Sequence, residues 1–310
     1  LNALKHNIKQ YQNHLRKGTK VMAMVKAFAY GSGSHEIASV LQFNKVDYLA
    51  VAYADEAVEL RKAGISMPVM VMNTESDSFE NLVEYRLQPV IFSHSLLSEL
   101  QSFLIEENIQ HFPVHIEINT GMNRLGFEPS QIDSVLDFFA SDTFKVESVF
   151  SHLVASEDPH HEQFTMSQYV IFNDVCDKLR NSIHYPFFRH LANSAAILRF
   201  PELQMDMVRL GIGLYGIDSG NTNDLELQEV STLRSTIAQI RHIRKGETVS
   251  YGRNDVAEND KVIATVRIGY ADGYPRSLGN RIGKMYVGGQ LAPIMGAVCM
   301  DMTMIDITHI

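Results

Sequence analysis

The chain of 310 residues has no tryptophan, two cysteines and no apolar run of the roughly eighteen residues that a membrane span needs. Cys176 and Cys299 lie far apart in apolar contexts, which excludes a disulfide framework and favours a reducing cytoplasm. No signal-peptide pattern appears in these residues. No block rich in lysine and arginine occurs and the net charge is −9, so the composition argues against nucleic acid and anionic membranes as partners.

What is present is ordinary soluble globular composition, with 45% hydrophobic and 20% charged residues. This length suits either one α/β barrel or two domains. The chain begins at Leu1 in helix-like sequence and stops at Ile310 in strand-like sequence. We therefore expect both ends to be trimmed, or the chain to be a piece of a longer polypeptide.

Apolar strand-like runs alternate with helical stripes up to about residue 215. The runs cover residues 21–26, 46–53, 68–72, 89–92, 114–119, 146–152, 188–192 and 207–215. Helical periodicity follows over residues 34–43, 54–63, 78–85, 94–106, 130–139, 164–180 and 194–199. Eight such alternations predict a closed (β/α)8 barrel of the TIM type. An open doubly wound sheet would usually carry a glycine-rich G-x-G-x-x-G loop after its first strand, and none follows that strand here.

Beyond about residue 221 the pattern changes to strand-like runs without long helices between them. These runs cover residues 235–243, 262–268, 284–287, 293–299 and 302–307. The sequence therefore predicts an α/β barrel over residues 1–225, followed by a mostly β C-terminal domain over residues 226–310.

Lys26 stands at the end of the first apolar run, where an unpaired ammonium is costly. A desolvated lysine is a nucleophilic amine of the kind that forms a Schiff base with a carbonyl cofactor. A lysine that extends out of a strand end into solvent is the structural alternative.

In a barrel the active site is built from the C-terminal ends of the strands. Here those ends carry Lys26 and Tyr30, the segment 119–124 with Arg124, then His152, the segment 190–194, and the segment 209–213 with Arg209. Each residue alone has a structural explanation, for instance His190 as a satisfied core histidine. Together they favour a catalytic centre.

Six short blocks resemble those of the alanine racemase family and occur in the family's order. They are residues 25–31 (VKAFAYG), 119–127 (NTGMNRLGF), 190–195 (HLANSA), 208–212 (VRLGI), 268–274 (IGYADGY) and 299–301 (CMD). The resemblance implies a pyridoxal-phosphate-dependent enzyme that interconverts L- and D-alanine for bacterial wall precursors. It also implies a head-to-tail homodimer with residues of both subunits at each site.

Racemisation needs an electron sink, which the imine of pyridoxal phosphate with the amino acid supplies, and an acid/base group on each face of the substrate. By resemblance these two groups are Lys26, which also holds the cofactor, and Tyr270 of the partner subunit. The same resemblance gives the cofactor contacts to Tyr30, His152, Asn193, Ser194, Arg209, Gly211 and Ile212, with His190 supporting Arg209. It gives the substrate contacts to Arg124 and to Met300 and Asp301 of the partner subunit, which leave room for little beyond a methyl side chain.

Arg209 bears on the protonation state of the cofactor's pyridine nitrogen. If it faces the pyridine nitrogen, as the resemblance implies, it can only donate, since a guanidinium stays protonated. The ring nitrogen is then an unprotonated acceptor and the cofactor a weaker electron sink, which suppresses transamination in favour of reprotonation.

Two departures from the family pattern stand out. Many members have a carbamate-modified lysine two residues before the Asn119 position, where this chain has Glu117, already a carboxylate that can hold Arg124. The family's C-terminal stretch, with its phosphate-contacting tyrosine, has no counterpart before Ile310, and without it we do not expect full activity.

Two other functions stay open. One is a broader racemase acting on serine or larger amino acids. The other is a non-catalytic pyridoxal-phosphate carrier built from a single barrel, against which the β domain with Tyr270 and Met300-Asp301 argues.

Overall fold

The computed structural model describes residues 1–222 and 224–310. They form two compact units, Leu1–Ser231 and Thr232–Ile310. The boundary predicted from the sequence lies between residues 225 and 226.

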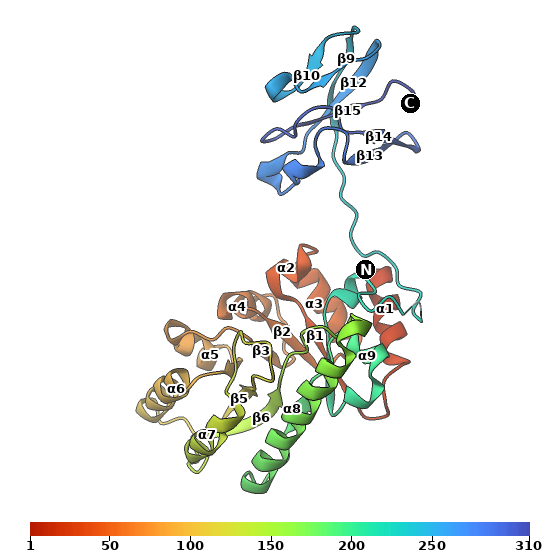
Figure 1. The fold of residues 1–310 in the computed structure, drawn as a ribbon. Coiled ribbons are helices and arrows are strands. Elements are labelled where there is room, and N and C mark those ends of the chain that lie inside the picture. The colour runs from red at the N-terminus through yellow and green to blue at the C-terminus, as the bar shows by residue number, and fades with distance from the viewer. Residues whose placement is uncertain (223) are drawn as a thin grey trace. The chain divides into compact units, whose positions relative to one another are not determined.

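The first unit is built on eight parallel strands in an almost closed barrel (Figure 1). The strands are β1 (Lys20–Met24), β2 (Tyr48–Val51), β3 (Val69–Val71), β4 (Gln88–Ile91), β5 (Phe112–Glu117), β6 (Phe144–Phe150), β7 (Phe188–His190) and β8 (Met207–Leu210). Hydrogen bonds from Asp206 N to Arg189 O (3.2 Å) and from Arg209 N to Ala192 O (2.9 Å) join the two ends of the sheet. The predicted barrel is confirmed.

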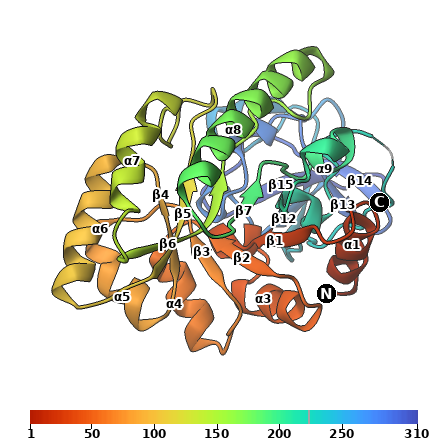
Figure 2. The same ribbon diagram turned by 90° about the horizontal axis from the view of Figure 1, so that it is seen from below.

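Helices surround the strands on the outside (Figure 2). They are α1 (Asn2–Gln12), α3 (Ser34–Phe43), α4 (Ala54–Lys62), α5 (Phe79–Glu84), α6 (His94–Glu106), α7 (Ile132–Phe138), α8 (Glu162–Ser182) and α9 (Ala196–Arg199). A further short turn, α2 (Lys26–Tyr30), follows β1. Within the described residues, no helix combines the length and the apolar character needed to cross a membrane.

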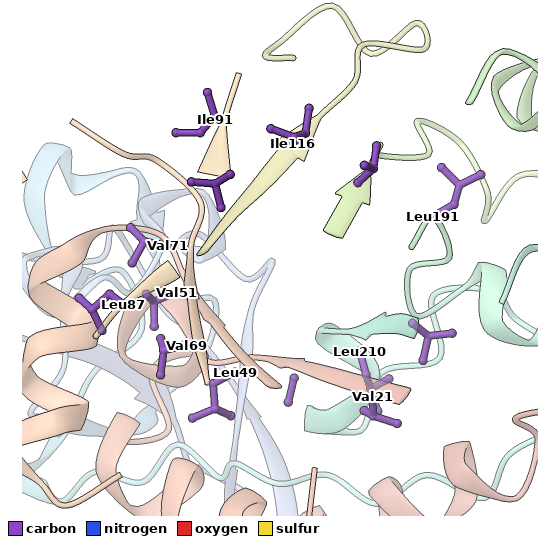
Figure 3. Packing of buried hydrophobic residues seen from close by; sticks show 14 of the residues in the cluster. Val21, Leu49, Val51, Val69, Val71, Leu87, Ile91, Ile116, Leu191 and Leu210 are labelled. Atoms are coloured by element: carbon purple, nitrogen blue, oxygen red, sulfur yellow. The ribbon is translucent and has the colours of Figure 1, made fainter. Parts of the chain in front are cut away.

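The period-two alternation of the strands sorts side chains into two layers. On β1, Val21 and Ala23 belong to the large core that extends to the helices, whereas Met22 and Met24 belong to a smaller cluster inside the barrel. Figure 3 shows residues of the large core on successive strands, such as Leu49 on β2, Val69 on β3 and Ile91 on β4. Polar residues at alternate positions of β5 to β8 therefore share the barrel interior with the methionines.

The second unit is mostly β, as predicted. Its central sheet has the order β15-β12-β9, and two small hairpins accompany it. The strands are β9 (Ile237–Ile243), β10 (Thr248–Val249), β11 (Asp255–Val256), β12 (Lys261–Val266), β13 (Lys284–Val287), β14 (Gln290–Pro293) and β15 (Thr303–Asp306). Ala264, Ile294 and Ile305 are fully buried in its core.

Three expected elements differ from the structure. The predicted strand over residues 293–299 is wrong, because β14 ends at Pro293 and the chain then bends through Gly296 at a φ of 74°. The opening strand ends at Met24, short of Lys26. The last barrel strand ends at Leu210, after which Ile212–Tyr215 form a 3-10 turn.

Candidate active site

A cavity of about 190 Å³ lies at the C-terminal ends of the barrel strands. It is lined by Met24, Lys26, Tyr30, Met72, Arg124, His152, Glu157, Asn193, Ser194, Ala195, Arg209, Gly211, Ile212 and Ser219. All the cofactor-contacting residues expected from the sequence, and Arg124, thus meet in one cavity. His190 and Glu117, both buried, neighbour Arg209.

Lys26 and Tyr30 reach this cavity through an unusual backbone. Residues 27–30 all have positive φ, with Ala27 at φ 52° and ψ 54° and Phe28 at φ 55° and ψ 43°. This is one turn of left-handed helix without a glycine in it, at a cost of about 1–2 kcal/mol per residue. Glu56 of α4 helps to hold the turn, since its carboxylate accepts hydrogen bonds from Ala27 N at 2.5 Å and Ala52 N at 2.7 Å.

The surroundings of Lys26 favour a neutral amine. Burial lowers its pKa, the positive charge of Arg124 lowers it further, and Glu56 partly opposes both. An amine freed of its proton can attack a carbonyl group. The structure therefore supports the nucleophilic interpretation of Lys26 over that of a lysine extended into solvent.

Hydroxyl and backbone groups after β7 and β8 form a cradle beside Lys26. Ser194 Oγ accepts a hydrogen bond from Gly211 N at 3.0 Å. A Cβ at Gly211 would come within 2.9 Å of Tyr30 Oη, so glycine keeps this space open. Asn193 Oδ1 caps the start of α9 through Ala196 N at 3.0 Å. Such clusters of hydroxyls and amides at the last strands of a barrel suit a phosphate group.

The spacing G-x-G-x-x-G does occur in the chain, at residues 211–216. It follows the last barrel strand instead of the first and forms a 3-10 turn ending in Gly216. A Cβ at Gly213 would lie 2.2 Å from Tyr11 Oη, so the second glycine serves packing against α1. The segment is therefore part of the barrel cradle, without a dinucleotide fold.

Arg209 is 3% exposed and its guanidinium is almost fully engaged. Nη1 donates to His190 Nδ1 at 2.9 Å and to His190 O at 3.0 Å, and Nη2 donates to Ser151 O at 2.6 Å and Leu191 O at 3.2 Å. Burial lowers its pKa to about 10, against the effect of Glu117. Within residues 1–222 and 224–310, the Nε–H group is the donor that has no protein partner, and it fits an acceptor in the cavity.

The groups around Arg209 complete the electrostatics. Burial, followed by Arg209, lowers the pKa of His152 to about 3, so this imidazole is neutral; its Nδ1 lies 3.4 Å from Arg209 Nη2. Burial raises the pKa of Glu117, while Arg209 and Arg124 oppose that change. The cavity combines an amine of lowered pKa, two arginines and a hydroxyl cradle, which fits a carbonyl cofactor with a phosphate group.

Several cavity and supporting residues were not found from the sequence. Met24, Met72, Ala195 and Ser219 carry no chemical signal. Met24 is the last residue of β1 and the other three follow strands, and this position in the fold is what brings them to the cavity. Glu56 had a local signal: it stands three residues after Tyr53, the N-cap of α4, as in a capping box.

The predicted residues of the second unit lie next to one another on that unit. Tyr270 N donates to Cys299 O at 3.0 Å, and Ala271 N donates to Met300 O at 2.8 Å. Tyr270 is 41% and Met300 58% exposed, and Asp301 is also exposed. The Arg276 guanidinium lies 5.4 Å from the centre of the Tyr270 ring, a cation–π contact.

A barrel whose strand ends gather a lysine of lowered pKa, two arginines and a cradle of hydroxyl and backbone groups, followed by a β domain, defines a pyridoxal-phosphate-dependent racemase. Family models for the N-terminal and C-terminal domains of alanine racemase match residues 1–219 and 230–310. The chain belongs to the alanine racemase family, and the resemblance seen in the sequence is confirmed.

Individual relatives of known sequence or structure support the same family. The alanine racemase of Clostridium tetani is 39% identical and covers 100% of this chain and 81% of its own length. A solved alanine racemase of Clostridium difficile 630 has a TM-score of 0.92 at 32% identity, over 99% of this chain and 81% of that chain. The alanine racemase of Bartonella henselae, solved with covalently bound pyridoxal phosphate, has a TM-score of 0.87 at 28% identity, over 100% and 84%.

The left-handed turn yields a stability prediction. Phe28 is 65% exposed at φ 55°, so Phe28→Gly removes backbone strain and loses little packing. We expect the free energy of unfolding in urea to stay unchanged or rise by up to about 1 kcal/mol. Val170→Gly, at a 56% exposed position of α8, is the matched control and should cost roughly 0.5–1 kcal/mol. Equal destabilisation by the two changes would contradict the strain.

Proposed function

We propose that this racemase interconverts L- and D-alanine by a two-base mechanism, with Lys26 and Tyr270 on opposite faces of the substrate. The observation that carries the proposal is the cavity in which Lys26, with its lowered pKa, meets Tyr30, Ser194 and Arg209. The names of the relatives, alanine racemases in Clostridium and Bartonella, support alanine as the substrate.

Bound pyridoxal phosphate supplies the electron sink for removal of the α-proton. Lys26 holds it and, once released by the substrate, takes or returns a proton at its Nζ atom. Tyr30 and Ser194 bind the phosphate with the backbone near Gly211 and Ile212. Asn193 fixes the position of Ser194 through the cap of α9. His152, Arg209 and His190 bind and orient the ring side, with Arg209 donating from Nε.

The second base belongs to a second copy of the chain. Tyr270 and Met300 share one exposed surface of the C-terminal unit. If that surface of one copy contacted the cavity of the other copy, it would bring the Tyr270 phenol to the substrate and, through Met300, restrict the size of the substrate side chain. Met300 and Asp301 would then leave room for a small side chain, while Arg124 binds the substrate carboxylate. The assembly is a homodimer with shared sites. Its place is the cytoplasm and its product D-alanine for peptidoglycan.

Glu117 takes the place of the modified lysine of other members. It is 4% exposed, and the charges of both Arg124 and Arg209 act on its carboxyl group. A fixed carboxylate at this position orients Arg124 without any carbon dioxide adduct.

A second candidate is a broader racemase that also accepts serine. The serine/alanine racemase of Enterococcus gallinarum is 36% identical over 99% of this chain, which is 44% of that relative. Turnover of L-serine at a rate similar to L-alanine would favour it. Bound cofactor without turnover of any amino acid would instead favour a carrier.

The first test is the cofactor lysine. Lys26→Ala should lose the visible absorption of the bound cofactor that borohydride shifts, and should lose racemisation of L-alanine in a coupled-oxidase or circular-dichroism assay. Lys62→Ala, at the exposed end of α4, is the control and should keep both signals. A Lys26→Ala protein that keeps the reducible band would overturn the assignment.

The shared site predicts complementation. Lys26→Ala and Tyr270→Phe should each be inactive alone, but a heterodimer of the two has one site with both native residues. Random exchange of subunits makes half of the dimers mixed, so we expect roughly one quarter of wild-type activity after mixing. Activity that never returns on mixing, although subunit exchange is detected, would mean that Tyr270 acts within its own chain.

Glu117 predicts independence from bicarbonate. Removing carbon dioxide should leave wild-type activity unchanged, because the carboxylate is part of the side chain. Glu117→Gln removes the negative charge facing Arg124 and should raise the KM for alanine more than it lowers kcat. Glu117→Lys should gain activity on addition of bicarbonate, and a bicarbonate response of the wild type would refute the assignment.

A further inference from the structure

A chain of polar side chains extends from Arg209 across the interior of the barrel to β4. His190 Nε2 lies 2.7 Å from Ser148 Oγ, which lies 2.6 Å from His115 Nδ1. His115 Nε2 in turn lies 3.0 Å from Gln88 Oε1. His190, Ser148 and His115 are all 0% exposed. Each is an inward position of its strand, beside the methionine cluster, and the proposed function gives no role to Ser148, His115 or Gln88.

The chemistry of the arginine fixes the direction of every hydrogen bond in this chain. Since a guanidinium has no acceptor, Arg209 Nη1 donates and His190 Nδ1 accepts. Burial lowers the pKa of His190 well below its usual range, so the imidazole is neutral and its one proton is on Nε2. That proton goes to Ser148 Oγ, which leaves the serine hydroxyl to donate to His115 Nδ1.

The same reasoning continues to the end of the chain. Burial lowers the pKa of His115 to about 3, so this ring is neutral as well. Because its Nδ1 accepts from Ser148, its proton is on Nε2 and is donated to Gln88 Oε1. Gln88 opposes the rise in the pKa of Tyr48 that burial causes, the direction expected when an amide nitrogen donates to the phenol oxygen. All the donors point away from Arg209.

We propose that Ser148 and His115 are positioning residues that hold His190 in its Nε2–H tautomer, and thereby hold Arg209 with its Nε–H directed at the cavity. The opposite tautomer would place an N–H of His190 against an N–H of Arg209, two donors 2.9 Å apart. Arg209 would have to move to relieve that contact. The tautomer of His190 follows from its hydrogen bonds, whereas its consequence for the reaction depends on the proposed function.

The other contacts of His190 do not select its tautomer. His190 also stacks on Phe150 with ring centres 5.0 Å apart, and the Arg209 guanidinium lies 5.1 Å from the centre of the same ring. These contacts fix the planes of both groups but do not distinguish the two ring nitrogens. In the described part of the chain, Ser148 is the partner of His190 Nε2, so the choice of tautomer depends on this hydroxyl.

The test uses nitrogen-15 NMR of histidine side chains in the full chain, with and without added pyridoxal phosphate. We expect His190 and His115 to be neutral Nε2–H tautomers in both forms. In Ser148→Ala, His190 should lose its single-tautomer pattern, and Ser148→Thr, which keeps the hydroxyl, should restore it. Thr165→Val removes another buried hydroxyl, one without a partner among the described residues, and should change nothing. An Nδ1–H or mixed tautomer of His190 in the wild type would overturn the proposal whatever the variants do.

The reaction gives a second readout. With Arg209 less firmly held, Ser148→Ala should raise transamination relative to racemisation about fivefold, the effect of losing one buried hydrogen bond. Thr165→Val should leave that ratio unchanged. An altered tautomer with an unchanged ratio would reduce the chain to a structural role. If the wild type racemises no amino acid, the proposed function fails while the tautomer measurement still decides this inference.

Discussion

A guanidinium donates hydrogen bonds and never accepts one, and the interior of this barrel is arranged around that constraint. Arg209 is buried in a space lined in part by methionine, where an unsatisfied charge would be costly. Three backbone carbonyls and two neutral imidazoles surround it at its Nη atoms, and Glu117 supplies an opposite charge. Because these groups take up the Nη donors, the Nε–H group is the donor left to act in the cavity. The histidines are effective partners only as neutral rings, which burial ensures.

The second constraint is the left-handed turn after β1. A regular strand would continue to alternate and would send Lys26 and Tyr30 in directions set by the pleat. Four consecutive non-glycine residues with positive φ instead bring both side chains to one cavity, with Glu56 holding the backbone from α4. Conformational cost at a site that must place a lysine and a phenol accurately is a recurring feature of functional sites.

Much of this could be predicted from the sequence, and the failures have physical causes. Helices over residues 34–43 and 94–106 were predicted with their observed bounds, because each has a clear apolar stripe between polar ends. The left-handed turn was not predicted, since Ala27, Phe28 and Ala29 give no sign of positive φ. β10 and β11 have two residues each, too few to show any period. The proximity of Tyr270 to Met300 depends on pairing of strands far apart in the chain, which only the family resemblance indicated. The polar chain had a signal that was overlooked: on β5, His115 and Glu117 alternate with Val114 and Ile116, which places both polar residues inside the barrel.

Apolar and polar side chains share the barrel interior, and this mixture bears on the reaction. The apolar residues include Met22, Ala50, Met70 and Val90 from β1 to β4 and Phe150 and Met207 from β6 and β8, while His115, Ser148, His190 and Arg209 occupy inward positions of β5 to β8. Because the apolar residues exclude water, the polar groups must satisfy one another, and a chain of one-way hydrogen bonds does so without adding a second buried cation. In that arrangement Arg209 can neither lose its proton near neutral pH, with a pKa of about 10, nor turn an acceptor toward the cavity. The control over which reaction the cofactor undergoes would then extend from Arg209 in the cavity to inward-facing residues of β5, β6 and β7.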